Sequence, residues 1–566
     1  MQAGDRIGIT GMGVICAIGN NPDEVCRSLR GGVSGIGQVK YLETRHRDLP
    51  VGEVKLSNAE MAEMLGLQAE KPYSRTSLMG ALGVRQALRE AGIESVEGKR
   101  VALISGTTVG GMDVAELYWE QLKRGENPEN LPISNECGRS TEEIASYAGV
   151  KGAECCTIST ACSSALNAMM VGSNMLLCDK ADIVIAGGSE ALSRFHLNGF
   201  NTLMILDKER CRPFDASRAG LNLGEGAAFV VLQKNPKDAL AYVAGYGNRC
   251  DAFHQTATSE NGDGAFLAMS DALSMSGLEP CRIDYINAHG TGTPDNDISE
   301  SHAIQRVFGD NIPPVSSTKS FTGHTTSASG SIESVICILS MREGFIPSNL
   351  GWKTAMPGGV TPTLGVEQAR LGHVVCNSFG FGGNDSSLIL SKEPATLALP
   401  QQGFDCDVAA DVTIDKVEDL PALKEFVSPM ESRRMGKLMK AATLSALRAM
   451  KEAGIADPDA IMTGTSRGML ETSNQFLDDI YANGEELLKP TLFMQSTHNT
   501  IGSAIAIRTK CHGYNITYSQ GDDSLKWALE DARDKICSGA AGCALVGLYD
   551  ETSDDVLART IILKRK

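Results

Sequence analysis

A cysteine in a turn-forming setting is the first side chain of this 566-residue sequence that could do chemistry. Cys162 stands in TISTACSSAL (157–166), among small and hydroxyl residues, directly before an apolar, helix-like run. Small residues allow a sharp turn that exposes the sulfur, and a helix N-terminus lowers the pKa of a thiol by favouring the thiolate. The stretch predicts either a nucleophile or, as the alternative, a packed small apolar residue.

Two histidines and a lysine lie in later loops. His289 stands in NAHGTGTPDND (287–297), after a predicted strand, where α/β sheets place their sites. Lys319 and His324 stand five apart in SSTKSFTGHTTSASGSIE (316–333). Taken singly, the histidines are typical of hydrogen-bonded structural residues and the lysine of a surface residue.

A glycine-rich turn, NSFGFGGNDSS (377–387), follows these loops. Glycine-rich turns can bind phosphate, but this one lacks the GK[ST] of a P-loop and the setting of a dinucleotide fingerprint. The turn alone therefore indicates no particular ligand.

Short β-rich apolar runs that alternate with helix-like segments must position these residues. The segment 77–92 has helical apolar spacing. The alternation indicates α/β layers, with helices packed on sheets. The predicted strands are 6–14, 101–107, 181–188, 227–234, 240–247, 283–290, 373–383 and 386–392.

The early pattern returns after a proline-containing stretch, EPATLALPQQGFDC (393–406), which predicts a linker. Segments near 447–455, 461–470, 542–551 and 560–566 resemble segments near 85–93, 103–112, 181–190 and 229–235, in the same order. A repeat offset by about 360 residues predicts a second copy of roughly the first 235 residues, without a copy of 240–392.

Composition narrows the class of protein. The formal net charge of −17 disfavours nucleic-acid binding, and an acidic protein partner would need a local basic patch. The 16 cysteines, in a long chain with no signal-peptide pattern and no zinc-ribbon spacing, indicate reduced thiols and a cytoplasmic protein. No apolar run approaches about 18 residues, so no membrane span is expected.

The four stretches around Cys162, His289, His324 and the glycine-rich turn resemble the β-ketoacyl-ACP synthases, the condensing enzymes of fatty acid and polyketide synthesis. The resemblance runs from ITGMGVICAIGNNPDE (9–24) through CRPFDASRAGLNLGEGAA (211–228) to NSFGFGGND (377–385). It implies the thiolase fold, two similar halves in five layers, α-β-α-β-α, with a third, partial half at the C-terminus. The expected divisions are a synthase at 1–395 (halves at about 1–238 and 239–395), a linker at 396–406 and a degenerate N-half-like domain at 407–566.

The resemblance implies a Cys162–His289–His324 triad for a decarboxylative Claisen condensation. Cys162 holds the acyl group as a thioester, and malonyl-ACP loses CO₂ to give an enolate. Two neutral imidazole N–H groups, of His289 and His324, would stabilise that enolate in a water-poor pocket. Lys319 would orient or polarise the site. The product is a 3-oxoacyl-ACP.

The same resemblance assigns the remaining contacts. The backbone N–H groups of Cys162 and Phe381 form the oxyanion hole, and Phe381 also acts as a gate. Thr291 and Thr293 contact the phosphopantetheine arm, which the acyl carrier protein brings with it, so the synthase needs no cofactor and no metal.

Two positions depart from the family pattern. GHTTSASGSIE has threonine and serine where the family has a small Gly-Ala-Ala-Gly run. Met204 stands where a basic carrier-docking residue is expected, and the nearby basic residues are Lys208, Arg210 and Arg212.

The C-terminal copy has lost the cysteine. ITYSQGDDSL (516–525) places Gly521, or Asp522 after a shift of one residue, at the position of Cys162. His498 and His512 lie in no matching motif and predict structural roles. The copy resembles chain-length-factor subunits, in particular those of aryl polyene and flexirubin-type pathways, which predicts an intrachain pseudo-heterodimer. A homodimer, or a decayed duplication that merely covers a surface, is the alternative.

Several functions remain as alternatives to a specialised condensing enzyme. They are a housekeeping fatty-acid elongation synthase and a non-condensing binding or regulatory protein. A CoA-dependent thiolase is disfavoured because NSFGFGGND stands where thiolases carry a second cysteine. A zinc site made by Cys162, His289 and His324 has no supporting local ligand spacing.

Overall fold

The strands form one mixed sheet in the computed structural model, which describes residues 4–126, 135–397, 403–551 and 554–566. In these residues the order is β13-β17-β16-β14-β15-β3-β2-β4-β5-β1-β6-β12-β11-β7-β8. The first unit supplies β1 (Ile7–Cys16), β2 (Val101–Gly106), β3 (Glu154–Ile158), β4 (Ile183–Glu190) and β5 (Gly226–Lys234). The second supplies β6 (Ala241–Cys250), β7 (Tyr285–Asn287), β8 (Val315–Ser316), β11 (His373–Gly380) and β12 (Asn384–Ser391). The third supplies β13 (Cys406–Ile414), β14 (Ala460–Gly464), β15 (Tyr514–Tyr518), β16 (Cys543–Glu551) and β17 (Val556–Arg565).

Helices cover these strands in layers. The main helices are α3 (Arg75–Glu90), α6 (Cys137–Ala148), α7 (Ser164–Leu177), α9 (Asp263–Ser276), α10 (Pro294–Phe308), α12 (Ser329–Glu343), α14 (Lys437–Ala453), α17 (Thr500–Thr509) and α18 (Ser524–Cys537). The remaining helices and strands are α1 (Pro22–Arg30), α2 (Asn58–Leu65), α4 (Met112–Ala115), α5 (Trp119–Lys123), α8 (Arg194–Thr202), α11 (Lys319–Thr322), α13 (Pro429–Ser432), α15 (Leu470–Asn483), α16 (Pro490–Met494), β9 (Phe345–Ile346) and β10 (Glu367–Gln368). None of the helices in the described part of the chain is long and apolar enough to cross a bilayer.

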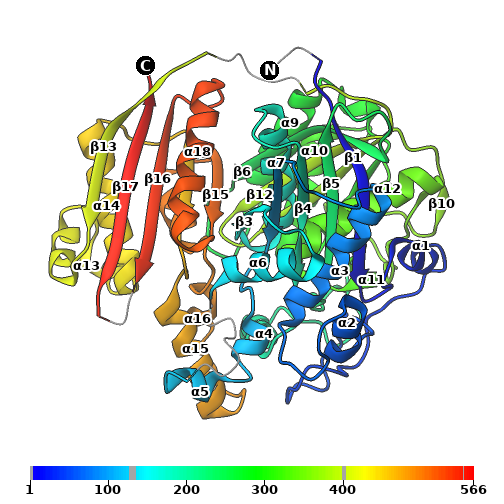
Figure 1. The fold of residues 1–566 in the computed structure, drawn as a ribbon, viewed down its shortest axis with the longest axis horizontal. Helices are drawn as coiled ribbons and strands as arrows, with labels where there is room; N and C mark the ends of the chain where they lie inside the picture. The colour runs from blue at the N-terminus through cyan, green and yellow to red at the C-terminus, as the bar shows by residue number, and fades with distance from the viewer. Residues whose placement is uncertain (1–3, 127–134, 398–402, 552–553) are drawn as a thin grey trace.

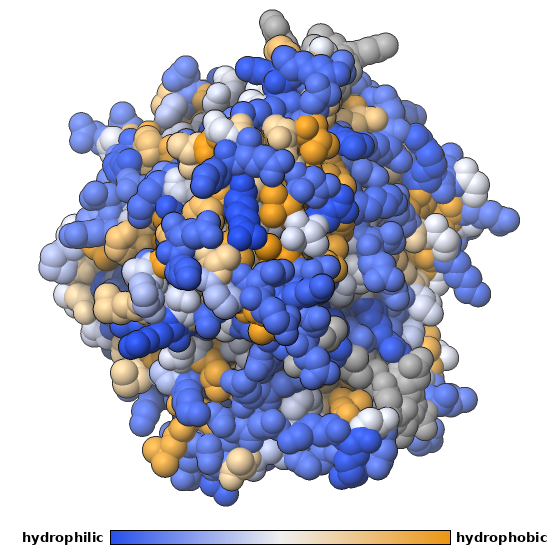
Figure 2. All heavy atoms as spheres, turned by 90° about the vertical axis from the view of Figure 1, so that its left-hand side faces the viewer, coloured by the Kyte–Doolittle hydropathy of each residue, from blue (hydrophilic) through white to orange (hydrophobic). Residues whose placement is uncertain are grey.

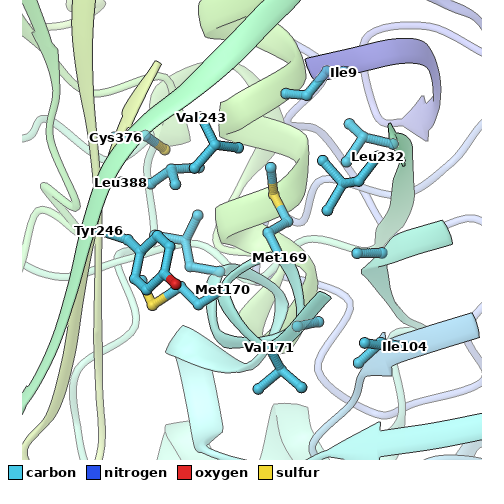
Figure 3. Close-up of a cluster of buried hydrophobic side chains, with 14 of the residues drawn as sticks. Ile9, Ile104, Met169, Met170, Val171, Leu232, Val243, Tyr246, Cys376 and Leu388 are labelled. Carbon is cyan, nitrogen blue, oxygen red and sulfur yellow. The ribbon is translucent and has the colours of Figure 1, made fainter. Parts of the chain in front are cut away.

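The first two units make the predicted five layers. Helices α3 and α6 pack outside the first sheet region, and α9 packs outside the second with α10 beside it. Helices α7 and α12 lie between the two sheet regions. Figure 3 shows Met169, Met170 and Val171 of α7 among side chains from both regions. The two regions are joined where β1 pairs with β6 over three residues.

The buried central helices explain why α7 and α12 carry so few charges. Helix α7, SALNAMMVGSNMLL, has no charged residue, because a charge enclosed between two sheets has no water to solvate it. Strands with both faces covered read as continuous apolar runs, which made most strand predictions straightforward. The predicted strands and helix 77–92 agree with β1, β2, β4, β5, β6, β7, β11, β12 and α3 to within a few residues.

The third unit repeats the strand order of the first. β15-β14-β16-β17-β13 matches β3-β2-β4-β5-β1, with α14 and α17 on one face and α18 on the other. The predicted duplication is therefore confirmed at the level of the fold. Of the predicted linker at 396–406, residues 398–402 lie outside the described residues. The unit boundaries drawn from the sequence stay predictions.

The third unit docks against the first through their edge strands (Figure 1). Strands β3 and β15 run antiparallel, and the N–H of Ser159 donates to the carbonyl of Thr517 while that of Ser519 donates to the carbonyl of Thr157, both at 2.9 Å. Ser159 and Ser519 are 360 positions apart, and so are Thr157 and Thr517, so each bond is the counterpart of the other. Reciprocal bonds of this kind between two copies indicate a pseudo-twofold axis. The predicted intrachain pairing is confirmed.

The third unit ends the sheet on the side away from its junction with the first unit. The edge strand there is β13, which pairs with β17 alone within the described residues. Figure 2 faces this side and shows mostly hydrophilic atoms with scattered apolar ones. A register shift between Val408 and Ala410, together with exposed Asp407 and Asp411, makes the strand a poor template for further pairing.

Candidate active site

Cys162 lies at the turn between β3 and α7. A single 3₁₀ turn, Ala161–Ser163, connects the strand to the helix, and Ala161 has a φ of 51°. The Thr160 N–H donates to the Ser164 hydroxyl at 2.9 Å, which ties the end of the strand to the first residue of the helix. The strand, the left-handed residue and the helix start bring the cysteine to the wall of the cavity.

The Cys162 thiol is buried among groups that favour its charged form. His324 Nε2 lies 3.1 Å from the sulfur, and the backbone N–H of Phe381 donates to it. Burial nevertheless raises the pKa of the thiol to about 12, and Lys319 opposes the shift. The expectation of a low thiol pKa at the helix start is therefore wrong for the protein without substrate, because the cost of desolvation exceeds the help from nearby N–H groups.

The two histidines stand at right angles beside the sulfur. The rings of His289 and His324 have centroids 5.3 Å apart and an interplanar angle of 82°. His324 Nδ1 lies 3.0 Å from the hydroxyl of Ser329, the first residue of α12. Burial and the Lys319 charge hold the pKa of both imidazoles well below the usual range, so both rings are neutral.

Glu300 of α10 shapes the loop that carries His289. Its carboxylate accepts the backbone N–H groups of His289 at 2.8 Å and Gly290 at 2.7 Å, and the Asn377 amide at 3.3 Å. Burial raises the pKa of Glu300 to about 7. Three donors on one carboxyl group hold the loop in place. The sequence did not indicate this role of Glu300.

Lys319 forms a buried ion pair. Its Nζ donates to Glu333 Oε1 of α12 at 2.6 Å, and the two side chains are 1% and 2% exposed. The charge therefore acts on the thiol and both imidazoles through space, while the ammonium group is held by Glu333. This arrangement fits the predicted orienting or polarising role better than a nucleophilic one.

Phe381 belongs to the short turn between β11 and β12. Its ring stacks on Phe200 of α8, with centroids 5.7 Å apart and planes 24° apart. Gly382 and Gly383 have φ values of 87° and 73°, which glycine adopts without strain. The Asn499 amide, from the third unit, donates to the Phe381 carbonyl at 2.9 Å. Contacts from the first unit, through Phe200, and from the third unit, through Asn499, therefore both hold the turn.

One cavity of about 420 Å³ joins these residues to the surface. Cys162, His289 and His324 line it together with Thr291 and Thr293, whose hydroxyls lie 2.9 Å apart. The structure therefore brings together all seven residues predicted from the sequence, Cys162, His289, Thr291, Thr293, Lys319, His324 and Phe381.

Met204 and the basic residues that follow it in the sequence differ in their setting. Met204, on the cavity rim, is 88% exposed. Lys208 and Arg210 are exposed as well. Arg212 pairs with Asp207 and Glu209, which reduces the positive charge it offers a partner.

A second, much smaller cavity of about 20 Å³ extends from Cys162 in the other direction. Phe493, Ser496 and Thr497 of the third unit form part of its wall, next to Phe200 and Phe381. The sequence analysis missed these residues. The only signal available was the repeat itself, since docking of a copy at β3 brings its α16 against α8.

The third unit holds no equivalent site. Gly521, with a φ of 54°, matches Ala161, and the Gln520 N–H bonds the Ser524 hydroxyl as Thr160 bonds Ser164. The shifted alignment is therefore the correct one, and exposed Asp522 occupies the cysteine position.

The two other histidines of the third unit have structural contacts. His498 Nε2 lies 3.1 Å from the Asn135 carbonyl and 3.5 Å from the Cys137 sulfur, and His512 Nδ1 lies 3.0 Å from the Cys250 carbonyl. All of these partners belong to the first two units. No cluster of potential metal ligands occurs in the residues that the structure covers.

Comparison with known proteins identifies the family. Residues 4–238 and 240–353 match the N-terminal and C-terminal domains of beta-ketoacyl synthases, and residues 410–561 match a second N-terminal-domain model. Nodulation protein E of Rhizobium meliloti is 32% identical over 413 residues, which is 68% of this chain and 99% of that protein. The chain belongs to the β-ketoacyl synthase family. A 3-oxoacyl-[acyl-carrier-protein] synthase 2 of Vibrio cholerae is 30% identical, over 68% of this chain and 99% of that synthase.

Solved synthase structures extend the likeness to the third unit. The ishigamide ketosynthase/chain length factor matches 69% of this chain and 99% of its own, with a TM-score of 0.62 and 31% identity. The keto synthase–chain length factor of PfaC matches 99% of this chain and 78% of its own, with a TM-score of 0.79. Its 16% identity shows the fold alone, but that fold includes all three units of this synthase.

Proposed function

We propose that this synthase condenses an acyl group, held on Cys162, with malonyl-ACP to give a 3-oxoacyl-ACP. The observation that carries the proposal is the grouping of the Cys162 sulfur, two neutral imidazoles and the Phe381 N–H in the wall of one cavity. Thioester exchange needs the first of these groups, and enolate stabilisation needs the imidazoles.

The first half-reaction transfers the acyl group. The Cys162 sulfur attacks the acyl-ACP thioester carbonyl, the bond from carbonyl carbon to the carrier sulfur breaks, and the thiol proton leaves with the carrier thiol. The N–H groups of Cys162 and Phe381 receive the developing oxyanion. Because the resting thiol has a pKa of about 12, we expect the His324 N–H and the Lys319 charge to stabilise the thiolate only as it reacts.

The second half-reaction forms the carbon–carbon bond. Malonyl-ACP loses CO₂, and its electrons pass into an enolate whose oxygen accepts the N–H groups of His289 and His324. The enolate carbon attacks the acyl thioester, and Cys162 leaves as a thiolate that takes up a proton. The Ser329 hydroxyl can donate to His324 Nδ1, which is compatible with the proton on Nε2 that this role requires.

Carrier proteins deliver both substrates in this proposal. Their phosphopantetheine arm enters along Thr291 and Thr293, so the synthase itself uses no cofactor. Exposed Lys208 and Arg210, which follow Met204 in the sequence, would contact the acidic carrier. A cytoplasmic location agrees with these soluble substrates.

The third unit contributes part of the wall of the small cavity that extends from Cys162. Phe493 closes that wall, so the third unit is placed to limit acyl length, as a chain length factor does. This contact favours a specialised acyl or polyene pathway, including the aryl polyene type, over housekeeping elongation.

Intact mass measurement tests the proposal directly. The protein is incubated with acyl-ACP donors of several lengths and then with malonyl-ACP. We expect one acyl adduct, its loss on addition of malonyl-ACP, and a longer 3-oxoacyl-ACP. Cys162→Ala should form no adduct, while Cys281→Ala, which removes an exposed thiol, should behave like wild type. Absence of any adduct with every donor would refute the proposal and favour a binding or regulatory role.

A further inference from the structure

The small cavity beyond Cys162 has polar groups in its wall. Thr108, His196 and Thr326 line it, together with aromatic side chains. These three residues are 7%, 3% and 4% exposed, respectively. The Thr108 hydroxyl hydrogen-bonds to Glu190, whereas His196 Nε2 and Thr326 Oγ1 have no hydrogen-bond partner among the residues described by the structure.

Such a wall is costly if the cavity receives only alkyl carbons. A buried polar group without a partner destabilises the folded protein, and an alkyl chain offers no atom that can pair with it. Phenylalanine, leucine or valine in the same places would avoid the cost. Two unpartnered polar atoms, His196 Nε2 and Thr326 Oγ1, in the wall of one cavity therefore indicate a ligand that carries a polar group.

The imidazole of His196 indicates which kind of polar group the ligand carries. Burial lowers its pKa to about 4, so the ring is neutral, and the Ala191 backbone acts on it as a hydrogen-bond acceptor. Because Nε2 has no partner, that acceptor pairs with the proton on Nδ1. The Nε2 lone pair then needs a donor, which none of the described residues supplies, and His196 lines the cavity.

Thr326 occupies a strained position in the same wall. Its φ of 45° is unusual for a β-branched residue and strains the backbone. It belongs to the Thr-Thr-Ser stretch that departs from the family's small-residue run. A glycine would adopt this φ freely, but only a hydroxyl residue offers the cavity a hydrogen bond.

We propose that the cavity beyond Cys162 is a subsite for a hydroxyl group on the acyl chain. The hydroxyl donates to His196 Nε2 and accepts from the Thr326 hydroxyl. The preferred donor is thus a hydroxyacyl thioester rather than a plain alkyl or keto one, since a ketone oxygen cannot donate. The inference rests on the proposed function, because the acyl group must reach the cavity from Cys162.

Initial rates of Cys162 acylation, followed by intact mass, test the subsite. The donors are hexanoyl-ACP, 3-oxohexanoyl-ACP and hexanoyl-ACPs hydroxylated singly at carbons 3 to 6. We expect at least one hydroxylated donor to react about 5- to 30-fold faster than hexanoyl-ACP, the effect of one or two hydrogen bonds. The 3-oxo donor should show no such gain.

Variants separate the subsite from general damage to the fold. His196→Phe and Thr326→Ala should remove most of the hydroxyl preference, while Thr326→Ser should keep it. Thr497→Val is the matched control, because Thr497 lines the same cavity but its hydroxyl already lies 2.9 Å from that of Thr500. If His196→Phe fails to fold, the comparison of Thr326→Ala with Thr326→Ser carries the test.

Each outcome is decisive. Equal rates for hydroxylated and plain donors, or a preference that survives both His196→Phe and Thr326→Ala, would overturn the subsite. An equal gain with the 3-oxo donor would overturn the donor role of the hydroxyl. Failure of every donor to acylate Cys162 would instead refute the proposed condensing function, and the subsite with it.

Discussion

Replacing Phe493 should lengthen the acyl groups that this synthase accepts. The Phe493 side chain is buried, and its ring centroid lies 6.0 Å from that of Phe195, 5.3 Å from Phe200 and 5.9 Å from Phe476. The ring also packs on the backbone of Gly199, where an added Cβ would lie 2.1 Å from it. Phe493→Ala removes the wall that faces Cys162 and leaves these neighbours in place.

The magnitude follows from the size of the ring. Its six carbons leave room for about two to four more methylenes of an acyl chain, and each buried methylene gains about 0.8 kcal/mol. The preference for longer donors should therefore rise about 15- to 200-fold. The same cavity should lower the free energy of unfolding by about 3–5 kcal/mol, because the neighbouring side chains relax only in part.

Competition between alkyl donors measures the change. Equimolar acyl-ACPs from four to twelve carbons are mixed with enzyme, and the adducts on Cys162 are counted by intact mass. Phe476→Ala is the matched control, since Phe476 is fully buried in the same aromatic cluster but does not line the cavity. An unchanged length profile in folded Phe493→Ala would refute the reasoning. An equal shift in Phe476→Ala would show that loosening of the cluster, not removal of a wall, sets length.

Three further substitutions test other contacts. Lys319→Met leaves the Glu333 carboxylate buried alone, so urea unfolding should show that the free energy of unfolding falls by about 3–5 kcal/mol. The double variant Lys319→Met, Glu333→Leu should recover that stability without restoring activity. Unchanged stability of the single variant would contradict the ion pair. Burial raises the Glu190 pKa from 4.5 to about 7, so the stability it contributes is complete below pH 4.5 and is lost as the pH rises through 7. Glu190→Gln should therefore gain about 1–3 kcal/mol relative to wild type between pH 5 and 8, and a constant difference across that range would argue against the shift. Asn499→Ala removes the bond to the Phe381 carbonyl and should slow Cys162 acylation about 5-fold in a stopped-flow assay, with Asn499→Gln recovering part of the rate; equal rates would show that the bond does not position the turn.

Much of the fold was predictable because both faces of most strands are covered. Buried strands read as apolar runs, and β1, β2, β4 and β5 stood out for that reason. Strand β3 was not predicted, since its five residues, ECCTI, begin with an exposed glutamate and are too short to show a period. The duplication was visible because the order of similar segments is independent of loop lengths.

The site was only partly predictable. The roles of Cys162, His289 and His324 came from resemblance, since their separate stretches show no proximity. The cysteine-equivalent position needed the matching φ values of Ala161 and Gly521, because loops of different length shift the two copies by one residue. The sequence could not predict which residues contact each other across the junction between the first and third units.

His196 and Phe493 illustrate the limit of sequence reasoning. His196 reads as one polar residue in a short helix, and nothing in its neighbours shows that it lines a cavity. Phe493 lies nearly 300 residues away on another unit, yet contacts the same aromatic cluster. Burial and partner atoms decide such roles, and both arise only when the chain has folded.

The junction of β3 with β15 determines how this protein responds to dilution. Two separate subunits fall apart as their concentration drops, but here both belong to one chain, so docking is a unimolecular step with a fixed effective concentration. Synthesis delivers the two units in equal number and leaves no surplus of either. Because β15 already occupies the edge of β3, a second molecule cannot pair there, and each assembly built on this junction holds a single reactive thiol of the Cys162 kind.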